Sequence, residues 1–374
     1  MRLFVSVAVP LAMLVSTPHP LNASSETDAQ TGQVSARTLA TKLAARLESD
    51  FVYPEQGRKY AAALTSNAAA GKYDVLKGAA LAKKLGEDLQ SVAQDRHLRV
   101  MYEGEGGGGG PPILIKRPAD GTASPDKQPT LIRMMPPPII EHARWLTPGI
   151  AFVRFSLFPG EAETTEAARQ FMATHADAKT IIFDLRTHMG GGLDEMDAIF
   201  PWLFAQPTRL VSLAARKSVD EAGANPVSDV QSLRRVEADP NFVTREHWAT
   251  PGKDKRLFSA KVYVLTSGYT GSAAEHFALA FKHSKRGTLI GKATYGANHF
   301  GGDQDLGGGF TAFIPVGRAY DPTTGKDWEG VGVAPDIDVP AKDALIKALT
   351  LSGVSPSTAA KLSAEVAPSA LPGL

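Results

Sequence analysis

The second half of the chain alternates short β-rich runs with amphipathic segments, and this alternation restricts the fold more than any other feature. From Gly149 onward, runs of β-branched and aromatic residues read IAFVRFSLF, TIIFDLR, RLVSLAAR, KVYVLTS, TLIGKA and GFTAFIPV. Between some of them lie TTEAARQFMATHA and GSAAEHFALAFKHS, which have apolar residues at helical spacing. Strands that alternate with helices predict an α/β domain with a largely parallel sheet, which we assign to residues 149–345.

Different patterns flank this domain. Residues 34–102 include VSARTLATKLAARLESDFV and AALAKKLGEDLQSVAQD, whose leucines predict a small helical bundle within an N-terminal region, 24–103. The connection 104–148 is rich in Gly and Pro, and its run GEGGGGGPP predicts a hinge or a disordered loop. The weak helix KDALIKALT leads into a Ser/Ala/Pro-rich tail, 346–374, which we expect to be mobile.

The start of the chain has the pattern of an export signal. After Arg2 comes an apolar run, Leu3 to Val15, that is short for a membrane span but has the length of a signal-peptide core. Cleavage after Ala23 would remove residues 1–23. We therefore expect an exported protein, periplasmic or extracellular, with no membrane span after signal removal.

Composition excludes several kinds of function. Lys and Arg number 40 against 39 Asp and Glu, so there is no overall charge to attract nucleic acid, and we expect no nucleic-acid partner. The absence of cysteine excludes disulfides, thiolate zinc sites and cysteine nucleophiles, so any catalysis must use oxygen or nitrogen groups. His276 and His283 lie seven positions apart, but no third ligand stands at a recognisable spacing, and we expect no metal site.

Ser272 occupies a position suited to a nucleophile. It follows the strand KVYVLTS and opens the helix GSAAEHFALAFKHS, where free N–H groups and the helix dipole can stabilise negative charge. The same residues also form a capping-box pattern with Glu275, and by itself the pattern favours a helix cap over catalysis.

A second segment offers the hydrogen-bond donors that an acyl-transfer site needs. The strand in TIIFDLRTHMGGG ends in a triple glycine, Gly190 to Gly192, whose N–H groups a substrate carbonyl could approach closely. A helix-entry turn would use the same residues. Asp184 and Arg186 are interpreted as a structural pair at the strand end. No phosphate-loop or dinucleotide pattern follows a strand, so nucleotide binding is not expected.

DLRTHMGGG, VYVLTSGYTGSAAEHFALAFKHSKRGTLIGKATYG and WEGVGVAPDIDVP, in this order, resemble the core of the C-terminal-processing, or tail-specific, serine peptidases. The resemblance covers roughly 149–340. The earlier segment QDRHLRV resembles the branch that contains the tricorn core protease and the interphotoreceptor retinoid-binding protein repeats. The resemblance implies a crotonase/Clp-protease-like α/β core behind the N-terminal helical bundle. It also implies peptide-bond hydrolysis through an acyl-enzyme on Ser272, a peptide or protein substrate, and no cofactor.

The residue that would serve as catalytic base differs from the lysine that most of the family uses. Tail-specific peptidases use a serine-lysine dyad, but the position of that lysine is Ala297 here, and Lys292 is the nearest lysine. The resemblance to the tricorn-like branch implies instead His97 as base and Glu329 as supporting carboxylate. Lys292 and His276 remain alternatives to His97.

The same resemblance assigns the oxyanion donors. They would be the N–H of Ala273 and one from the triple glycine, Gly191 or its neighbour Gly190, and bulky residues should not be tolerated at these glycines.

Two features leave the function open. Residues 103–148 are too few and too rich in Gly and Pro for the PDZ-like module that tail-specific peptidases usually carry. The retinoid-binding-protein relatives also imply an alternative, a catalytically inactive binding protein for a hydrophobic ligand or peptide on the same fold. A non-peptide esterase is a third possibility. Oligomeric state is not indicated by the sequence.

Overall fold

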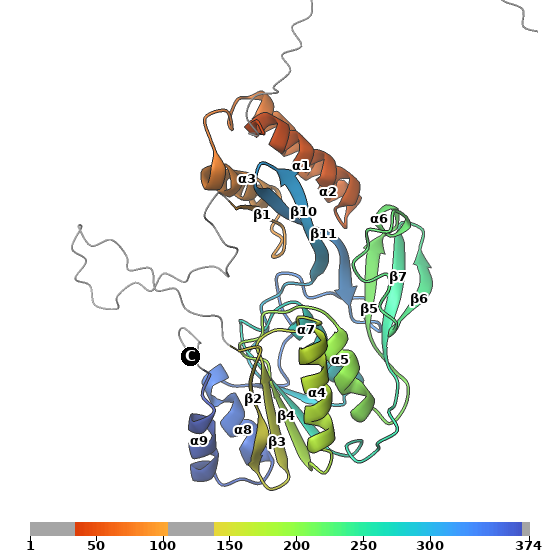
Figure 1. Cartoon of the computed structure of the whole chain (residues 1–374), viewed down its shortest axis with the longest axis vertical. Helices are drawn as coiled ribbons and strands as arrows, with labels where there is room; N and C mark the ends of the chain where they lie inside the picture. Colours follow the sequence, from red (N-terminus) through yellow and green to blue (C-terminus); the bar gives the residue numbers. More distant parts are fainter. Residues whose placement is uncertain (1–33, 104–137, 369–374) are drawn as a thin grey trace, which may run out of the picture. The chain divides into compact units, whose positions relative to one another are not determined.

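The computed structural model describes residues 34–103 and 138–368, and its α/β core contains the predicted, mostly parallel sheet (Figure 1). Its strand order is β12-β9-β8-β4-β3-β2. Strands β3, β4, β8, β9 and β12 run parallel, and β2 pairs antiparallel to β3. The bounds are β2 (Ile140–Thr147), β3 (Ile150–Phe155), β4 (Thr180–Asp184), β8 (Lys261–Thr266), β9 (Thr288–Gly291) and β12 (Ile337–Asp338).

Helices cover both faces of this sheet, which explains why its central strands β3 and β4 are buried along their whole length and consist mainly of apolar residues. Phe183 and Val264 pack with α4 (Ala162–Thr174), α5 (Asp194–Ile199) and α7 (Ala273–Ser284). Ile182 and Leu265, the next residues along the same strands, pack on the other face with α8 (Ala344–Leu351) and α9 (Pro356–Glu365). Short 3₁₀ turns follow α5, at Phe200–Trp202, and precede α8, at Ala341–Asp343.

A second, antiparallel sheet was not predicted. Its order is β1-β11-β5-β7-β6, and β10 also pairs with β11. The sequence runs of β5 and β11 were correctly predicted as strands, but their pairing partners were missed because those partners are polar and irregular. The bounds are β1 (Arg99–Tyr102), β5 (Thr208–Arg216), β6 (Leu233–Asp239), β7 (Phe242–Ala249), β10 (His299–Gly307) and β11 (Phe310–Tyr320), and α6 (Lys217–Glu221) follows β5.

The N-terminal helical bundle is confirmed. Leucines of α1 (Ala36–Asp50), α2 (Pro54–Ala69) and α3 (Gly78–Val92) form a common apolar core that continues onto β10 and β11 (Figure 1). One part of the prediction was wrong, because the last residues of the 34–102 segment form β1 and pair with β11. The bundle therefore shares its core with the second sheet.

Two further expectations need correction. The predicted helix KDALIKALT is present as α8, but the Ser/Ala/Pro-rich end after it, which was expected to be mobile, contains α9, and both helices pack on the sheet. The connection 104–148 was interpreted as a Gly/Pro-rich segment, yet its last part forms β2, Ile140–Thr147. The signal segment 1–23 and the glycine run lie outside the described residues. Within the described ranges, no helix has the length and apolar character to cross a membrane.

Candidate active site

The turn that carries Ser272 is attached to the end of the neighbouring strand β4. The hydroxyl of Ser267 donates to the Arg186 carbonyl (2.6 Å), and the hydroxyl of Thr270 donates to the Leu185 carbonyl (2.7 Å). Because β4 and β8 are parallel neighbours, their carboxyl ends meet at one edge of the sheet. Ser272 is therefore presented at this edge, beside the segment that leads to the triple glycine.

The backbone of Ser272 is strained. Its φ of 53° and ψ of −120° lie in a region that L-residues rarely adopt. Lys285 also has a positive φ, 55°, but it is an ordinary left-handed helix C-cap. No such role explains Ser272, and a serine on a sharp, strained strand-to-helix turn is the arrangement that exposes the nucleophile of many hydrolases.

The glycine segment packs directly against Ser272. A Cβ added to Gly190 would stand 2.7 Å from the Ser272 Cβ and 3.3 Å from its Oγ, and one added to Gly191 would stand 1.8 Å from the Phe158 carbonyl oxygen. Both residues have a φ above 120°. The predicted intolerance of bulkier residues at these glycines therefore has a steric basis.

The N–H groups of this segment differ in their partners. Gly190 donates to Nδ1 of the buried His188 (3.1 Å), and burial lowers the pKa of that imidazole to about 3, which keeps it an acceptor. Within the part of the chain that the structure describes, the N–H groups of Gly191 and Ala273 have no acceptor. Of the three predicted oxyanion donors, Gly190 is thus already engaged, while Gly191 and Ala273 are available.

Glu275 connects Ser272 to a second loop, residues 294–298. Its carboxylate accepts from the Ser272 N–H (2.8 Å), so the reciprocal half of the predicted capping box is present. It also accepts from the Thr294 hydroxyl (2.5 Å) and from the N–H groups of Gly296 (2.6 Å) and Ala297 (2.8 Å). Burial raises the pKa of Glu275 to about 7 even though these donors oppose the shift.

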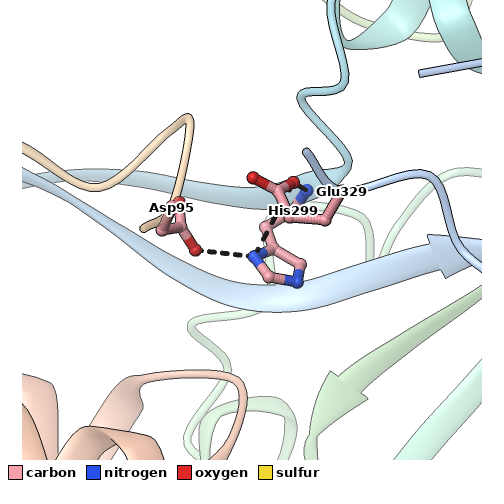
Figure 2. Close-up of side chains that lie close together, drawn as sticks. All are labelled: Asp95, His299 and Glu329. Carbon is pink, nitrogen blue, oxygen red and sulfur yellow. Dashed lines mark hydrogen bonds and ion pairs between the residues drawn. The ribbon is translucent and has the colours of Figure 1, made fainter. Parts of the chain in front are cut away.

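The same loop is held at its far end by Glu329, in a cluster with Asp95 and His299 (Figure 2). Oε2 of Glu329 accepts from the Asn298 N–H (2.6 Å) and lies 3.9 Å from Nδ1 of His299. Nδ1 of His299 is 2.6 Å from Oδ2 of Asp95. Burial alone would lower the pKa of His299, but the hydrogen bond and charge of Asp95, and the charge of Glu329, outweigh it and raise this pKa.

This cluster also fixes the turn that contains His97. Oδ1 of Asp95 accepts from the N–H groups of His97 (2.9 Å) and Leu98 (2.8 Å), and Oε1 of Glu329 accepts from the Arg96 N–H (2.9 Å). The structure thus brings Glu329 to the His97 turn.

The imidazole of His97 itself is not bonded to Ser272. It stacks on Phe313, with ring centroids 5.4 Å apart, and burial lowers its pKa to about 4. Among the described residues no hydrogen bond joins His97 to Ser272.

The cluster of Figure 2 is also the one group of at least three metal-ligand side chains found among the described residues. Its geometry fits an ion pair better than a metal site. The distance of 2.6 Å between Nδ1 of His299 and Oδ2 of Asp95 is that of a hydrogen bond. Two ligand atoms that each lie about 2 Å from one metal ion are separated from one another by more than this distance.

The other histidines and Lys292 have separate partners. Nε2 of His276 is 2.8 Å from Nδ1 of His247, whereas His283 is 3.3 Å from Asp321, so the two helix histidines do not share a site. The ammonium of Lys292 is 2.7 Å from Asp338, in an exposed ion pair.

Sequence reasoning missed His299, Asp95 and His188 as members of the site. Asp95 was treated only as a neighbour of His97, and His299 stands in a polar stretch with no motif around it. The one available signal for His299 was its distance from Ala297, the position of the lysine in the tail-specific peptidases. In an extended chain, side chains two residues apart point the same way. The confirmed pairing of Arg186 with Asp184 (2.7 Å) also involves Arg154 (2.8 Å), which was not predicted.

Comparisons with known proteins agree with these motifs. The model of peptidase family S41 matches residues 149–339. The chloroplastic C-terminal processing peptidase of Tetradesmus obliquus is 29% identical over 202 residues, which cover 52% of this chain and 37% of that protein. The photosystem II D1 C-terminal processing protease has a similar fold, with a TM-score of 0.53 and 18% identity over 90% of this chain and 99% of that one. From its motifs, its fold and this match, the chain belongs to peptidase family S41.

Proposed function

We propose that the protein is a serine peptidase that hydrolyses peptide bonds through an acyl-enzyme on Ser272. One observation carries the proposal: a strained Ser272 stands at the start of α7 beside two N–H groups, of Gly191 and Ala273, that lack acceptors among the described residues. A helix cap alone explains neither the strain nor the unused donors. Membership of peptidase family S41 supports the same chemistry.

In the proposed reaction, Oγ of Ser272 attacks the carbonyl carbon of the substrate, and His97 accepts the hydroxyl proton. The N–H groups of Gly191 and Ala273 stabilise the oxyanion. The C–N bond then breaks, His97 gives the proton to the leaving amine, and an acyl-enzyme remains. Water, deprotonated by His97, attacks the ester carbonyl and releases the carboxylic acid product and Ser272.

His97 is the proposed base because the resemblance to the tricorn-like branch assigns this role to it, and its lowered pKa, about 4, leaves the imidazole uncharged at neutral pH. Glu329 supports it indirectly, through the Arg96 N–H. The proposal requires the side chain of His97 to leave the Phe313 ring and turn toward Ser272 when substrate binds, as sites often tighten only in the substrate complex.

The test is covalent capture of the nucleophile. A fluorophosphonate reagent that reacts with activated serines should add once to the purified protein, and peptide mapping by mass spectrometry should place the adduct on Ser272. The Ser272→Ala variant should not be labelled. Peptide hydrolysis by a protein whose adduct maps to another serine would contradict the proposal.

His299, whose Nδ1 faces Asp95 and whose buried Nε2 has no partner among the described residues, is a second candidate base, and the pH dependence of kcat/KM separates it from His97. With His97, kcat/KM for an uncharged, amidated peptide should fall on the acid side with an apparent pKa near 4. With His299, whose pKa is raised above about 6.5, the rate should instead keep rising at higher pH, since that base must first lose its proton. Profiles of kcat/KM between pH 3.5 and 9 for wild type and His299→Gln decide between them, because a rise near pH 7 that comes from Glu275 persists in His299→Gln.

Stability gives an independent check on the state of His299. Because its folded pKa is raised, the ion pair with Asp95 stabilises the fold fully below pH ~6.5, and this contribution is lost as pH rises through the folded pKa. The difference in melting temperature between the wild type and His299→Gln should therefore shrink with rising pH. A difference that instead grows as pH rises toward ~6.5 and is constant above it would show that His299 is uncharged in the fold.

The absence of a hydrogen bond between His97 and Ser272 in the described structure favours one second candidate, a binding protein that does not hydrolyse its ligand. That candidate predicts no phosphonate adduct on Ser272, together with binding of apolar peptides that survive incubation intact.

A further inference from the structure

His188 joins the two halves of the candidate active site. Its carbonyl accepts from the N–H of Gly271 (3.0 Å), the residue directly before Ser272. Its side chain turns to the glycine segment, where Nδ1 accepts from the N–H of Gly190 (3.1 Å). One residue therefore bonds both to the turn that carries the proposed nucleophile and to the segment that would supply an oxyanion donor.

Two hydrogen bonds fix the peptide units on either side of Gly190. The unit before it donates to His188, and the unit after it accepts, through the Gly190 carbonyl, from the N–H of Phe158 (2.9 Å). Because a trans peptide directs its N–H opposite to its carbonyl, the Gly191 N–H, which belongs to the second unit, points away from Phe158. The N–H of Gly192 returns to the Phe158 carbonyl (2.7 Å). The direction of the Gly191 N–H is thus set by the hydrogen bonds of its neighbours.

The bond to His188 matters because glycine does not hold this conformation by itself. Gly190 has a φ of 126°, and without a Cβ its backbone has many other conformations of similar energy. A side chain would restrict the backbone, but a Cβ at this position would stand 2.7 Å from the Cβ of Ser272. The residue beside Ser272 is therefore glycine, and its orientation must come from hydrogen bonds.

The imidazole of His188 is otherwise in apolar surroundings. It is 0% exposed, and its ring packs against Phe158 with centroids 4.2 Å apart and an interplanar angle of 73°. Burial lowers its pKa to about 3, so the ring is neutral, and since Nδ1 accepts a hydrogen bond, Nε2 carries the hydrogen. Within the described ranges, Nε2 has no partner. An apolar side chain of similar size would fill this space without burying an unpartnered N–H, so the acceptor at Nδ1 is what the imidazole adds.

We propose that His188 is a positioning residue of the peptidase reaction: its Nδ1 holds the Gly190 peptide in the orientation in which the Gly191 N–H faces the oxyanion formed at Ser272. This inference rests on the proposed peptidase function and deepens it by assigning a residue that acts through Gly190 rather than on the substrate. The bond from Gly191 strengthens as the oxyanion forms. A misdirected Gly191 N–H should therefore lower kcat and leave KM nearly unchanged.

The experiment replaces the imidazole by side chains that keep, lose or displace the acceptor. In His188→Asn the amide oxygen is bonded to Cγ, as Nδ1 is in histidine, so the acceptor is kept. His188→Leu has a comparable volume and no acceptor, and His188→Gln places its oxygen one bond farther from the backbone. The matched control is His175→Leu, because His175 is also buried against a phenylalanine ring, with centroids 4.5 Å apart, but precedes β4, whereas His188 follows it. For each variant, kcat and KM for one peptide and the melting temperature are measured.

His188→Leu should lower kcat by about 100-fold, the effect of losing one oxyanion donor, with KM within about threefold of wild type. His188→Asn should keep at least about a third of the wild-type kcat. His175→Leu should lower the melting temperature but keep kcat, which separates positioning from a general loss of stability. If His188→Leu does not fold, His188→Gln supplies the comparison and should show the same loss of kcat. A kcat for the variant without a placed acceptor within about threefold of wild type, or no higher kcat in His188→Asn, would overturn the inference.

Hydrogen exchange separates this inference from the proposed function, because it needs no turnover of substrate. Exchange of the Gly190 amide, followed by NMR of isotope-labelled protein, should be slow in wild type and in His188→Asn, and at least about tenfold faster in His188→Leu, where the hydrogen bond is lost. This pattern without any hydrolysis by wild type would support the contact of His188 with Gly190 and overturn the peptidase proposal. Hydrolysis by wild type, with kcat and Gly190 exchange unchanged in His188→Leu, would do the reverse.

Discussion

Replacing Ser272 by alanine is expected to lower kcat for peptide hydrolysis by about 10⁴-fold or more, the largest effect on activity that any single substitution should produce here. The substitution removes the oxygen that we propose forms the acyl-enzyme. The N–H groups of Gly191 and Ala273 stay in place, so only the smaller rate enhancement from oxyanion binding and substrate positioning would remain.

The loss should not come from unfolding. Ser272→Gly also lacks the hydroxyl, but glycine tolerates the φ of 53°, and so it should raise the free energy of unfolding by about 1 kcal/mol while abolishing activity. Denaturant titrations and peptide assays on the same preparations measure both quantities. The matched control is Ser284→Ala at the other end of α7, whose hydroxyl donates to a carbonyl of its own helix, and it should keep wild-type kcat. Substantial hydrolysis by Ser272→Ala would remove Ser272 from the mechanism.

Asp184→Ala is expected to have the largest effect on stability, a loss of about 3–5 kcal/mol, which would leave much of the protein unfolded. Asp184 and Arg154 are 0% exposed, and Arg186 is 2% exposed. Asp184 lies 2.8 Å from Arg154 and 2.7 Å from Arg186. Without Asp184, the guanidinium of Arg186 would stay buried and lose the carboxylate with which it forms its hydrogen bonds.

The exposed Asp177 supplies the comparison for Asp184. It is 3.0 Å from Arg256 and has a side-chain exposure of 80%, so Asp177→Ala should change the free energy of unfolding by less than about 1 kcal/mol. Urea denaturation followed by far-UV circular dichroism measures both variants. If Asp184→Ala is insoluble, Asp184→Asn, which keeps the shape but loses the charge, provides the measurement. A loss for Asp184→Asn no larger than that for Asp177→Ala would contradict this account of the buried cluster.

The sign of the pH effect follows from the same contacts. Burial would raise the pKa of Asp184, but the charge and hydrogen bonds of Arg186 and Arg154 outweigh it and lower this pKa. The contribution is therefore present above the unfolded pKa of about 4 and is lost only as pH falls through the lower, folded value. The destabilisation in Asp184→Asn should be constant between pH 6 and 8. This network also supports the catalytic turn, because the Arg186 carbonyl accepts from Ser267.

The core elements were predictable because their signals are local. The apolar runs of β3, β4 and β8, and the 3.6-residue period of α4 and α7, record burial on both faces of one sheet. In the second sheet, only β5 and β11 have sequences that predict strands. Strand β10, HFGGDQDLG, contains glycine and charged residues and pairs with β11 through its backbone, so its sequence does not predict a strand. The tail helix α9 is short and rich in Ser and Ala, and it is recognisable only from its packing on the sheet.

The candidate site divides in the same way. Ser272, Ala273 and Gly191 lie in motifs, and sequence could place them at strand ends. The connection of Asp95 with His299 spans 204 positions, and it depends on a loop whose course is fixed by backbone hydrogen bonds to Glu275 and Glu329. Residue type alone contains no information about such contacts, because any residue except proline can donate its N–H.

That loop has a consequence for how such enzymes can diverge. The carboxylates of Glu275 and Glu329 accept hydrogen bonds from the backbone N–H groups of Gly296, Ala297 and Asn298. The side chain at 297 takes no part in these bonds. A change of the side chain at 297 therefore leaves intact the hydrogen bonds that hold this segment in place. A lineage could exchange lysine for alanine there, and recruit its proton acceptor from the helical region, without losing the framework that presents the serine.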